Sequence, residues 1–346
     1  MNFTNLSRYS PLSEKTYRRV FARRFDFALF NQGVIQAAIG EDAAVIAVMD
    51  ASFIAKSGKK TFGLDLFYNG SPSRVEKGLE VSLVGVVDGQ TEVGYGLLAE
   101  QTFDQAAFPE LTRMDYYRYH LGLARPHLPS QVRYLAVDGA YAKQPFVTGA
   151  VALNLHVISK LRRDANLQFV YEGEQKARGA RRNYDGKVDL ANLSRFTWVA
   201  QRQPGVDLYT QLVWHRSLKR QIRLAVLKDT RKPDKPGTVV LFSTDLTQSA
   251  QDIYRFYKLR FQIEFIFRFG QAVYRIKGLP SPRSQKTRLP LQCQFHRPQS
   301  CQTAGSAAAI GQSALRLFHG KRQATGTQRP SPRHLYFKVR SLADSD

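Results

Sequence analysis

Two apolar segments that each end at an aspartate constrain the fold of this chain more than any other feature. Residues 43–49 (AAVIAVM) lead to Asp50, and residues 132–137 (VRYLAV) lead to Asp138. Apolar, β-branched runs of this length are typical of buried central strands, which present the residue that follows them at one edge of the sheet. A single aspartate in this position is more often a turn or cap residue. Two of them predict neighbouring strands that bring two carboxylates together.

The other segments predict a mixed sheet with flanking helices. Residues 80–87 and 94–99 have the pattern of two strands joined at the Asp88-Gly89 turn. Helices are expected over 111–128 and about 144–152, a further strand over 155–162, and antiparallel strands at 196–199, 206–214, 221–227 and 238–243. The expected α/β organisation is a basic helical segment at 1–40, the first part of the core at 41–165, a β-rich insertion at 166–240, a helix that completes the core at 241–268, and a basic tail at 269–346.

A predicted helix near the end of the core carries a third acidic residue. It opens after Ser243-Thr244-Asp245 and contains no Gly or Pro up to Arg268. Tyr257, Arg260 and Glu264 are three and four positions apart, so we expect them on one helix face. One interpretation of this face is a structural ion pair. The other is a metal-binding carboxylate beside groups that hold a phosphodiester, because cations and phenols bind phosphate oxygens well.

The charge balance indicates a polyanionic partner. The 346 residues include 51 Lys and Arg against 28 Asp and Glu, a formal net charge of +23, and nucleic acid is the leading candidate for binding such a protein. No apolar run reaches the roughly 18 residues that suggest a membrane span, and the N-terminal segment lacks the apolar region of a signal peptide. We therefore expect a cytoplasmic protein. Cys293 and Cys301 are too few for a disulfide framework or a zinc site.

Two basic stretches provide candidate DNA contacts. Lys56 and Lys59 belong to a basic loop that follows the strand leading to Asp50, and Arg181 and Arg182 belong to the polar, basic stretch 174–187. Solvated loops without a partner are the alternative interpretation of both stretches. For the two tryptophans, Trp198 and Trp214, we favour positions in the core over a role as platforms for stacking bases.

Asp50, Asp138 and Glu264 together have the composition of a two-metal phosphoryl-transfer site. In such a site two divalent ions, about 4 Å apart, activate the attacking oxygen and stabilise the leaving one. Hard oxygen ligands suit Mg²⁺ or Mn²⁺. Carboxylates from two strand ends and one helix would be able to bridge such a pair of ions.

The segments around these acids resemble a known family. They read MDASFIAKSGK at 49–59, KGLEVSL at 77–83 and AVDGAY at 136–141. With the spacing of the tyrosine, arginine and glutamate of the predicted helix, they are similar to bacterial insertion-sequence DDE transposases of the IS-four type, whose signature is Y-(2)-R-(3)-E-(6)-K. The resemblance covers about residues 10–268.

This resemblance implies an RNase H-like mixed sheet, with a β-rich insertion before the last catalytic acid. It implies cut-and-paste transposition, in which DNA is cleaved at the ends of the element and the freed 3′-hydroxyl attacks target DNA. Asp50, Asp138 and Glu264 would hold two Mg²⁺ or Mn²⁺ ions, while Tyr257 and Arg260 would grip phosphates near the cleaved end. The implied partners are the terminal inverted repeats and the target DNA, bound by a dimer on paired ends. A non-catalytic DNA-binding remnant and another RNase H-like nuclease are the alternatives.

The chain departs from the family pattern after Arg268. The signature requires lysine at position 271, where this sequence has Gln271, and residues 269–343 contain no Asp or Glu. Back-translation of residues 271–302 with synonymous codons, read one base later, permits a product that begins with lysine and continues as an amphipathic helix rich in Phe, Leu and Ala. We therefore predict a shifted reading frame near the codons of residues 268–271, and a weak or inactive enzyme as encoded. A disordered basic DNA-binding tail is the other explanation.

Overall fold

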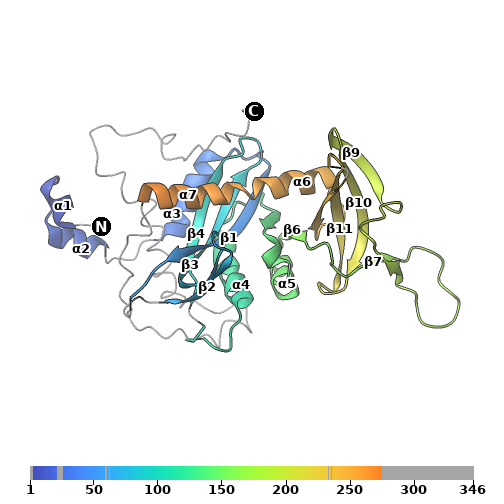
Figure 1. Cartoon of the computed structure of the whole chain (residues 1–346). Helices are drawn as coiled ribbons and strands as arrows, with labels where there is room; N and C mark the ends of the chain where they lie inside the picture. The colour runs from blue at the N-terminus through green and yellow to red at the C-terminus, as the bar shows by residue number, and fades with distance from the viewer. Residues whose placement is uncertain are drawn as a thin grey trace.

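The computed structural model describes residues 3–21, 26–58, 61, 63–103, 105–106, 108–232, 234 and 236–274. Lys59 and the tail after residue 274 lie outside the described residues, and so do the predictions that concern them. In the described part, helices cover both faces of one large mixed sheet (Figure 1). The helices are α1 (Phe3–Arg8), α2 (Glu14–Phe21), α3 (Phe27–Ala38), α4 (Arg113–Ala124), α5 (Gln144–Ala152), α6 (Ala250–Leu259) and α7 (Gln262–Tyr274), with 3-10 turns η1 (Arg125–His127) and η2 (Gly139–Tyr141).

The sheet has twelve strands among the described residues. Its order is β2-β3-β1-β5-β6-β12-β11-β10-β7-β8, with β4 paired to β3 and β9 paired to β10. The first six strands are β1 (Val45–Ala55), β2 (Asp65–Asn69), β3 (Arg74–Asp88), β4 (Gly94–Gln101), β5 (Tyr134–Val137) and β6 (His156–Leu161). The last six are β7 (Leu167–Val170), β8 (Tyr184–Lys187), β9 (Thr197–Gln203), β10 (Val206–His215), β11 (Arg220–Asp229) and β12 (Gly237–Ser243).

The predicted adjacency of the two aspartate strands is confirmed. β1 and β5 pair in parallel, and the last pair is Met49 with Val137. Asp50 and Asp138 are therefore the residues that directly follow this last pair, side by side on the two strands. The prediction that the first strand ends at Asp50 is wrong. β1 continues to Ala55, because its other side stays paired with β3 along its whole length.

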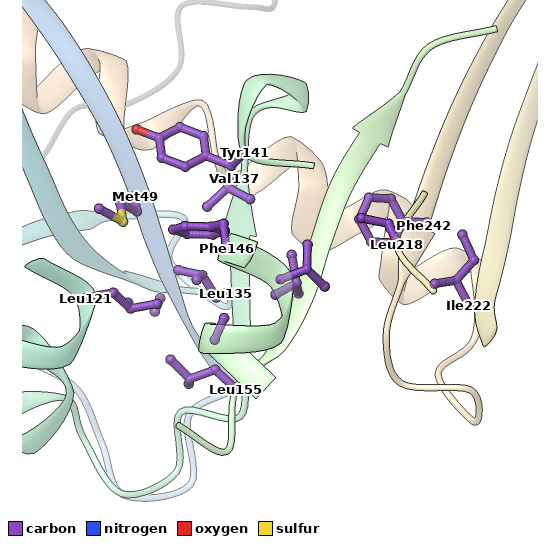
Figure 2. Packing of buried hydrophobic residues seen from close by; sticks show 14 of the residues in the cluster. Met49, Leu121, Leu135, Val137, Tyr141, Phe146, Leu155, Leu218, Ile222 and Phe242 are labelled. Carbon is purple, nitrogen blue, oxygen red and sulfur yellow. The ribbon is translucent and has the colours of Figure 1, made fainter. Parts of the chain in front are cut away.

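The alternation of side chains along β1 divides the core into two layers. Ala47 and Met49 face α3, α4 and α5, whereas Ile46 and Val48 face α6 and the start of α7. In Figure 2, the first layer is seen around Met49, Phe146 and their neighbours. Asp50 continues the even-numbered series, so its side chain lies on the face that α6 and α7 cover.

Several predicted elements are confirmed in and around the part of the sheet formed by β1 to β5. The hairpin of β3 and β4 is present, and α5 has the predicted limits. The helix expected over 111–128 is α4, whose capping box pairs Thr112 with Asp115, followed by the turn η1. The short strand β2, which pairs with the N-terminal part of β3, was not predicted.

The predicted antiparallel strands are also present, but they do not form a separate sheet. β12 pairs with β6 of the core, and β11, β10, β7 and β8 follow in order. They extend the core sheet on the right of Figure 1. The sequence therefore located the strands correctly, while their status as an insertion stays a prediction.

The helix that carries Glu264 is interrupted, which the sequence did not indicate. It begins at Ala250, with Ser249 as the cap that accepts from the Asp252 N–H, rather than directly after Asp245. At Arg260 and Phe261 the chain makes a tight turn, in which the Ile263 N–H donates to the Arg260 carbonyl, and α7 follows. The prediction of one continuous helix is therefore wrong, although α6 and α7 run end to end across the sheet (Figure 1).

The N-terminal segment consists of three short helices. α1 buries none of its side chains, whereas α3 contributes Ile35 to the core and its Asn31 amide donates to the Leu97 carbonyl at 2.8 Å. Among the described residues, no helix is both long enough and apolar enough to cross a membrane.

Candidate active site

Arg260 links two of the three predicted catalytic acids. Its Nη1 atom is 3.3 Å from Oδ2 of Asp50, and its Nη2 atom is 3.5 Å from Oε1 of Glu264. The Arg260 side chain is only 7% exposed, and its buried Nε atom has no hydrogen-bond partner among the described residues. Because both contacts are long for hydrogen bonds, their main effect is to compensate the charge of the acids.

The pKa of Asp50 reports on the other acids around it. Burial raises the pKa of the Asp50 carboxyl to about 6. The Ala51 N–H, which donates to Oδ1 at 2.8 Å, and the Arg260 guanidinium lower it, while Asp138 and Glu264 raise it. Like charges raise a carboxyl pKa only when they are near. Asp138 and Glu264 therefore each lie within electrostatic range of Asp50.

Asp138 is held by its backbone and exposes its carboxylate. It follows β5 and caps η2, where its side chain accepts from the Ala140 N–H at 3.4 Å. Its carbonyl accepts from Ser159 Oγ at 2.9 Å and from the Tyr141 N–H at 3.0 Å. The side chain faces solvent, so it is accessible to a ligand.

Tyr257 belongs to the same group despite the break between α6 and α7. The Arg260 guanidinium carbon is 5.6 Å from the centre of its ring. Burial raises the pKa of Tyr257, Arg260 lowers it, and Asp138 and Asp50 raise it. The predicted proximity of Tyr257, Arg260 and Glu264 is therefore present in the structure, even though the single helix that was to supply it is not.

The predicted basic residues lie in two places. Lys56 directly follows β1, and burial lowers its pKa. Arg181 and Arg182 are exposed between β7 and β8, at the opposite end of the sheet from β1. Arg182 is engaged locally, since it pairs with Asp185 and lies over the Tyr171 ring at 4.5 Å. The structure does not bring these two arginines to the acids.

The tryptophans differ in burial. Trp198 is 57% exposed and its Nε1 donates to Asp207 at 3.2 Å, so the prediction of a core position is wrong for this residue. It lies on β9, a strand that pairs with β10 off the main strand order, and this leaves its side chain exposed. Trp214 is half-buried and packs 5.9 Å from Tyr184.

The donor chemistry of the acids fits a hard divalent cation. In the described part of the chain, no three acidic, histidine or cysteine side chains are already arranged around a metal position. Asp50 and Glu264 nevertheless direct an oxygen at one shared cationic group, the Arg260 guanidinium, and Asp138 is within range. Carboxylate oxygens of this kind are the ligands that Mg²⁺ and Mn²⁺ prefer. Asp50, Asp138 and Glu264 are the described residues of this site whose side chains have such oxygens.

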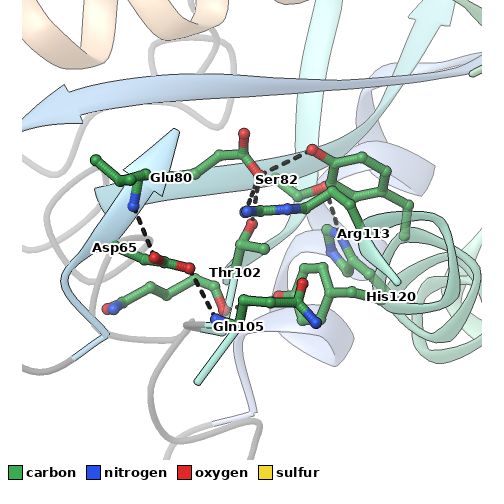
Figure 3. A network of polar contacts seen from close by, with 11 residues as sticks. Asp65, Glu80, Ser82, Thr102, Gln105, Arg113 and His120 are labelled. Atoms are coloured by element: carbon green, nitrogen blue, oxygen red, sulfur yellow. Dashed lines mark hydrogen bonds and ion pairs between the residues drawn. The ribbon is translucent and has the colours of Figure 1, made fainter. Parts of the chain in front are cut away.

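A buried acid on the opposite face of the sheet had been given no role from the sequence. Oε1 of Glu80 accepts from the Tyr117 hydroxyl at 2.8 Å, from Thr102 Oγ1 at 2.9 Å and from Arg113 Nη1 at 3.3 Å. Figure 3 shows Thr102 and Arg113 beside the Glu80 carboxylate. The sequence does contain a signal that could have identified Glu80: an acidic residue within the apolar run of β3. An acid in such a run is buried only when it is paired.

Beside this acid lies a second buried polar group. Ser82 Oγ is 2.9 Å from His120 Nδ1, and Ser82 pairs across the strands with Glu100. Burial lowers the pKa of His120 to about 3 and raises that of Glu100 well above its usual range. His120 is therefore neutral at physiological pH, which is how ionisable groups are usually accommodated in an interior.

Comparisons with known proteins place these residues in context. The model of the family described as "Transposase DDE domain" matches residues 112–291, slightly more than half of the chain. This range includes Asp138 and Glu264 and begins after Asp50. The comparison with curated proteins found no match. Among solved structures, endonuclease V from Bacillus subtilis is similar over 68% of this chain and 82% of its own, with 10% identity and a TM-score of 0.31.

Proposed function

The chain belongs to the transposase DDE domain family and is a transposase, and we propose that Asp50, Asp138 and Glu264 are its catalytic carboxylates. The observation that carries this proposal is that acids from β1 and α7 share a contact with Arg260, while Asp138 at the end of β5 acts electrostatically on Asp50. A structural ion pair needs a single acid. Two acids share one guanidinium here and Asp138 lies near Asp50, so negative charge is in excess, which favours a divalent cation.

The proposed fold is RNase H-like. Its support is the parallel set β1, β5 and β6, flanked by the antiparallel β3, with a helix pair crossing the face that presents Asp50. The proposed reaction is cut-and-paste transposition, with cleavage at the ends of the element and attack of the 3′-hydroxyl on target DNA. Two bound Mg²⁺ or Mn²⁺ ions would activate the attacking oxygen and stabilise the leaving one.

The residues around the acids have distinct proposed roles. Tyr257 and Arg260 contact phosphate oxygens near the cleaved end, which a phenol and a guanidinium do well. Lys56 follows the end of β1, six residues beyond Asp50 on the same strand, which suits a contact with the DNA segment next to the acids. Lys59, outside the described residues, keeps the same predicted role.

Arg181 and Arg182 suit a more distant contact on the DNA. They lie between β7 and β8, which are six and seven strands away from β1 in the sheet. At roughly 4.8 Å per strand this separation is about 30 Å, close to one turn of a DNA duplex, about 34 Å. The two arginines would therefore bind phosphates about one helical turn from the cleavage point, within a dimer that pairs two element ends.

The reading frame is the second part of the proposal. The IS-four signature requires a lysine at position 271, and α7 extends through this position, two turns beyond Glu264. A lysine here would lie on the same side of the helix as Glu264. We therefore infer that one base was gained or lost near the codons of residues 268–271, and that the encoded chain is weak or inactive because the support of Glu264 is altered.

Two proteins test both parts together: the chain as encoded, and the chain with the downstream frame restored. Strand cleavage is measured on DNA that carries the ends of the element, with Mg²⁺ and with EDTA, and binding is measured on the same DNA. The frame-restored protein should cleave only with the metal, and Asp138→Ala should abolish cleavage while leaving salt-sensitive binding in place. The encoded chain should bind but cleave much more slowly.

Each alternative predicts a different result. Binding without cleavage in both proteins would favour a non-catalytic remnant. Cleavage restricted to RNA–DNA hybrids or branched DNA would favour another RNase H-like nuclease. Cleavage that survives Asp138→Ala would contradict the assignment of the carboxylates, and full activity of the encoded chain would contradict the shifted frame.

A further inference from the structure

Two cations from different parts of the chain meet at the ring of Tyr254 on α6. The Arg202 guanidinium carbon is 5.3 Å from the centre of this ring, and the Lys258 Nζ atom is 5.7 Å from it. Lys258 lies one turn beyond Tyr254 on the same helix, whereas Arg202 lies on β9. Both cations are exposed to solvent. None of the three residues has a role in the proposed reaction.

The position of Arg202 comes from a β-bulge. Arg202 is the extra residue between two pairs that are adjacent on β10, Val206 with Gln203 and Asp207 with Gln201. A bulge of this kind changes the direction of a side chain relative to the regular alternation of the strand. Here the bulged residue reaches the ring of a helix that lies across the sheet. The contact between Arg202 and Tyr254 therefore depends on a specific irregularity of β9.

Neither of these cations has an acidic partner in the part of the chain that the structure describes. No ion pair among the described residues includes Arg202 or Lys258. Asp252, the acid of α6, accepts instead from the Ser249 hydroxyl at 2.7 Å. A cation–π contact positions a cation without neutralising it, and two positive charges near one ring repel each other. The arrangement therefore favours an anionic ligand, which both cations attract.

The cluster of Arg202, Tyr254 and Lys258 lies on the same side of α6 as Tyr257. The helix buries a stripe that consists of Ala250, Ile253, Phe256 and Leu259. At 3.6 residues per turn, Tyr254, Tyr257 and Lys258 fall on one side of this stripe and Arg255 falls on the other. Arg255 accordingly donates to the carbonyl of Gly89, after β3, at 2.8 Å.

This side of α6 connects the acids with the far part of the sheet. Tyr257 adjoins Arg260, whose guanidinium carbon is 5.6 Å from its ring, and Tyr254 lies three positions earlier on the helix. α6 contacts β5, β6, β12, β11 and β10 in turn, and in Figure 1 it extends from α7 to the strands on the right. The cluster therefore continues the proposed phosphate contacts of Tyr257 and Arg260 in the direction of β7 and β8.

We propose that Arg202 and Lys258 bind phosphates of the DNA backbone next to the cleavage point, with the Tyr254 ring keeping both cations in position. Exposed cations from two elements suit a polyanion that extends along α6. The DNA would thus follow α6 from the acids towards Arg181 and Arg182. The inference rests on the proposed function, which places the cleaved end of the DNA at the acids.

The test measures filter binding of the full chain to duplex DNA that carries the element ends, across a salt series in EDTA. Each phosphate contact contributes about 0.9 to the slope of log affinity against log salt concentration. The double variant Arg202→Gln/Lys258→Gln should therefore lower the slope by about 1.8 and weaken binding. Its melting temperature should stay close to that of the wild type.

The matched control is the double variant Arg231→Gln/Arg255→Gln. It removes the same total charge, from an arginine that pairs with Asp229 and from the opposite side of α6. We expect this control to keep almost the wild-type slope. Equal loss of slope in the two double variants would overturn the inference, since only the net charge of the protein would then matter.

The remaining outcomes separate this inference from the proposed function. A lower melting temperature of Arg202→Gln/Lys258→Gln with a wild-type slope would show that the cluster only attaches β9 to α6, and the inference would be wrong. The proposed function would stand in that case. If the wild type itself does not bind element DNA in a salt-dependent way, the proposed function fails and the inference fails with it.

A neutral methylphosphonate in place of one phosphate then locates the contact. It is moved along the half turn of DNA nearest the cleavage point, and binding is compared between the wild type and Arg202→Gln/Lys258→Gln. At the contacted phosphate the replacement should weaken binding of the wild type but not of the variant, because the two changes remove the same interaction. Equal weakening of both proteins at every position would contradict the proposed contact.

Discussion

The Nη1 atom of Arg260 lies 3.3 Å from the Oδ2 atom of Asp50, although 210 positions separate the two residues in the chain. The contact joins the turn between α6 and α7 to the middle of β1. Because Arg260 also reaches Glu264, one positive charge compensates two acids that the chain brings together from distant segments. Arg260 thus compensates part of the negative charge that we propose divalent ions neutralise in the active complex.

Replacing Arg260 should therefore destabilise the metal-free protein. Arg260→Met leaves Asp50 and Glu264 without their shared counter-ion, and we expect the free energy of unfolding to fall by about 2 kcal/mol. This value is below the cost of breaking a fully buried pair, roughly 3 to 5 kcal/mol, because both acids are partly exposed. Urea denaturation at pH 7 in EDTA measures it.

Lys258→Met is the matched control for this substitution. It removes the same charge from an exposed position on α6, and we expect a change within about 0.5 kcal/mol. Added Mg²⁺ should restore part of the stability that Arg260→Met loses. Equal effects of the two substitutions would show that Arg260 acts only through the net charge of the helix.

His120 should make the protein sensitive to acid. Its pKa in the fold is about 3, while that of an unfolded histidine is about 6.5. The unfolded state therefore takes up a proton below pH 6.5 and the folded state does not, so the contribution of His120 is complete above pH 6.5 and is lost as the pH falls towards 3. Between pH 7 and pH 4 this loss amounts to about 3 kcal/mol.

The substitution His120→Gln isolates this contribution. Glutamine keeps a polar group for Ser82 but does not take up a proton, so the difference in unfolding free energy between wild type and variant should change in favour of the variant as the pH falls. The contributions of the other titrating groups, including Asp50, are the same in both proteins, so they largely cancel in this difference of unfolding free energies. Parallel pH dependence from pH 7 to pH 4 would rule out a neutral buried His120.

The arginines between β7 and β8 should affect DNA binding without affecting chemistry. Each phosphate contact contributes about 0.9 to the slope of log affinity against log salt concentration. Replacing Arg181 and Arg182 with Gln should lower the slope by between one and two, since Arg182 is partly engaged by Asp185. Filter binding of duplex DNA across a salt series measures this change.

Arg231→Gln serves as the control for the DNA-binding measurement. Arg231 is exposed on the same part of the sheet and already pairs with Asp229 at 2.6 Å, so we expect its replacement to leave the slope almost unchanged. The cleavage rate of the bound complex should be the same for all these variants. If the double substitution leaves the salt dependence of the affinity unchanged, Arg181 and Arg182 do not contact the DNA.

The central strands could be predicted because burial on both faces leaves a clear signal. The runs before Asp50 and Asp138 are apolar throughout, and the structure pairs them in parallel. Chain direction then brings the two acids to one edge. The end of β1 was not predictable in this way, since the residues after Asp50 are kept in the strand by pairing with β3, which is a long-range effect.

Other features have no local signal in the sequence. The turn at Arg260 contains neither Gly nor Pro, and the sequence there reads as a continuous helix. Both Asp245 and Ser249 are residue types that cap the start of a helix. Ser249 caps α6, whereas Asp245 accepts a hydrogen bond from the Tyr134 hydroxyl at 2.8 Å. The network at Glu80 depends on donors that lie 22 to 37 positions away. Such features are determined by tertiary contacts, so they required the structure.

The most direct test of the catalytic assignment exchanges the chemistry of one ligand. In the frame-restored protein, Asp138→Cys replaces a hard oxygen with a soft sulfur, which binds Mn²⁺ in preference to Mg²⁺. Cleavage of DNA that carries the element ends is measured with each metal. If Asp138 is a metal ligand, the variant should lose cleavage in Mg²⁺ and regain part of it in Mn²⁺. Unchanged cleavage in Mg²⁺ would contradict the assignment of Asp138.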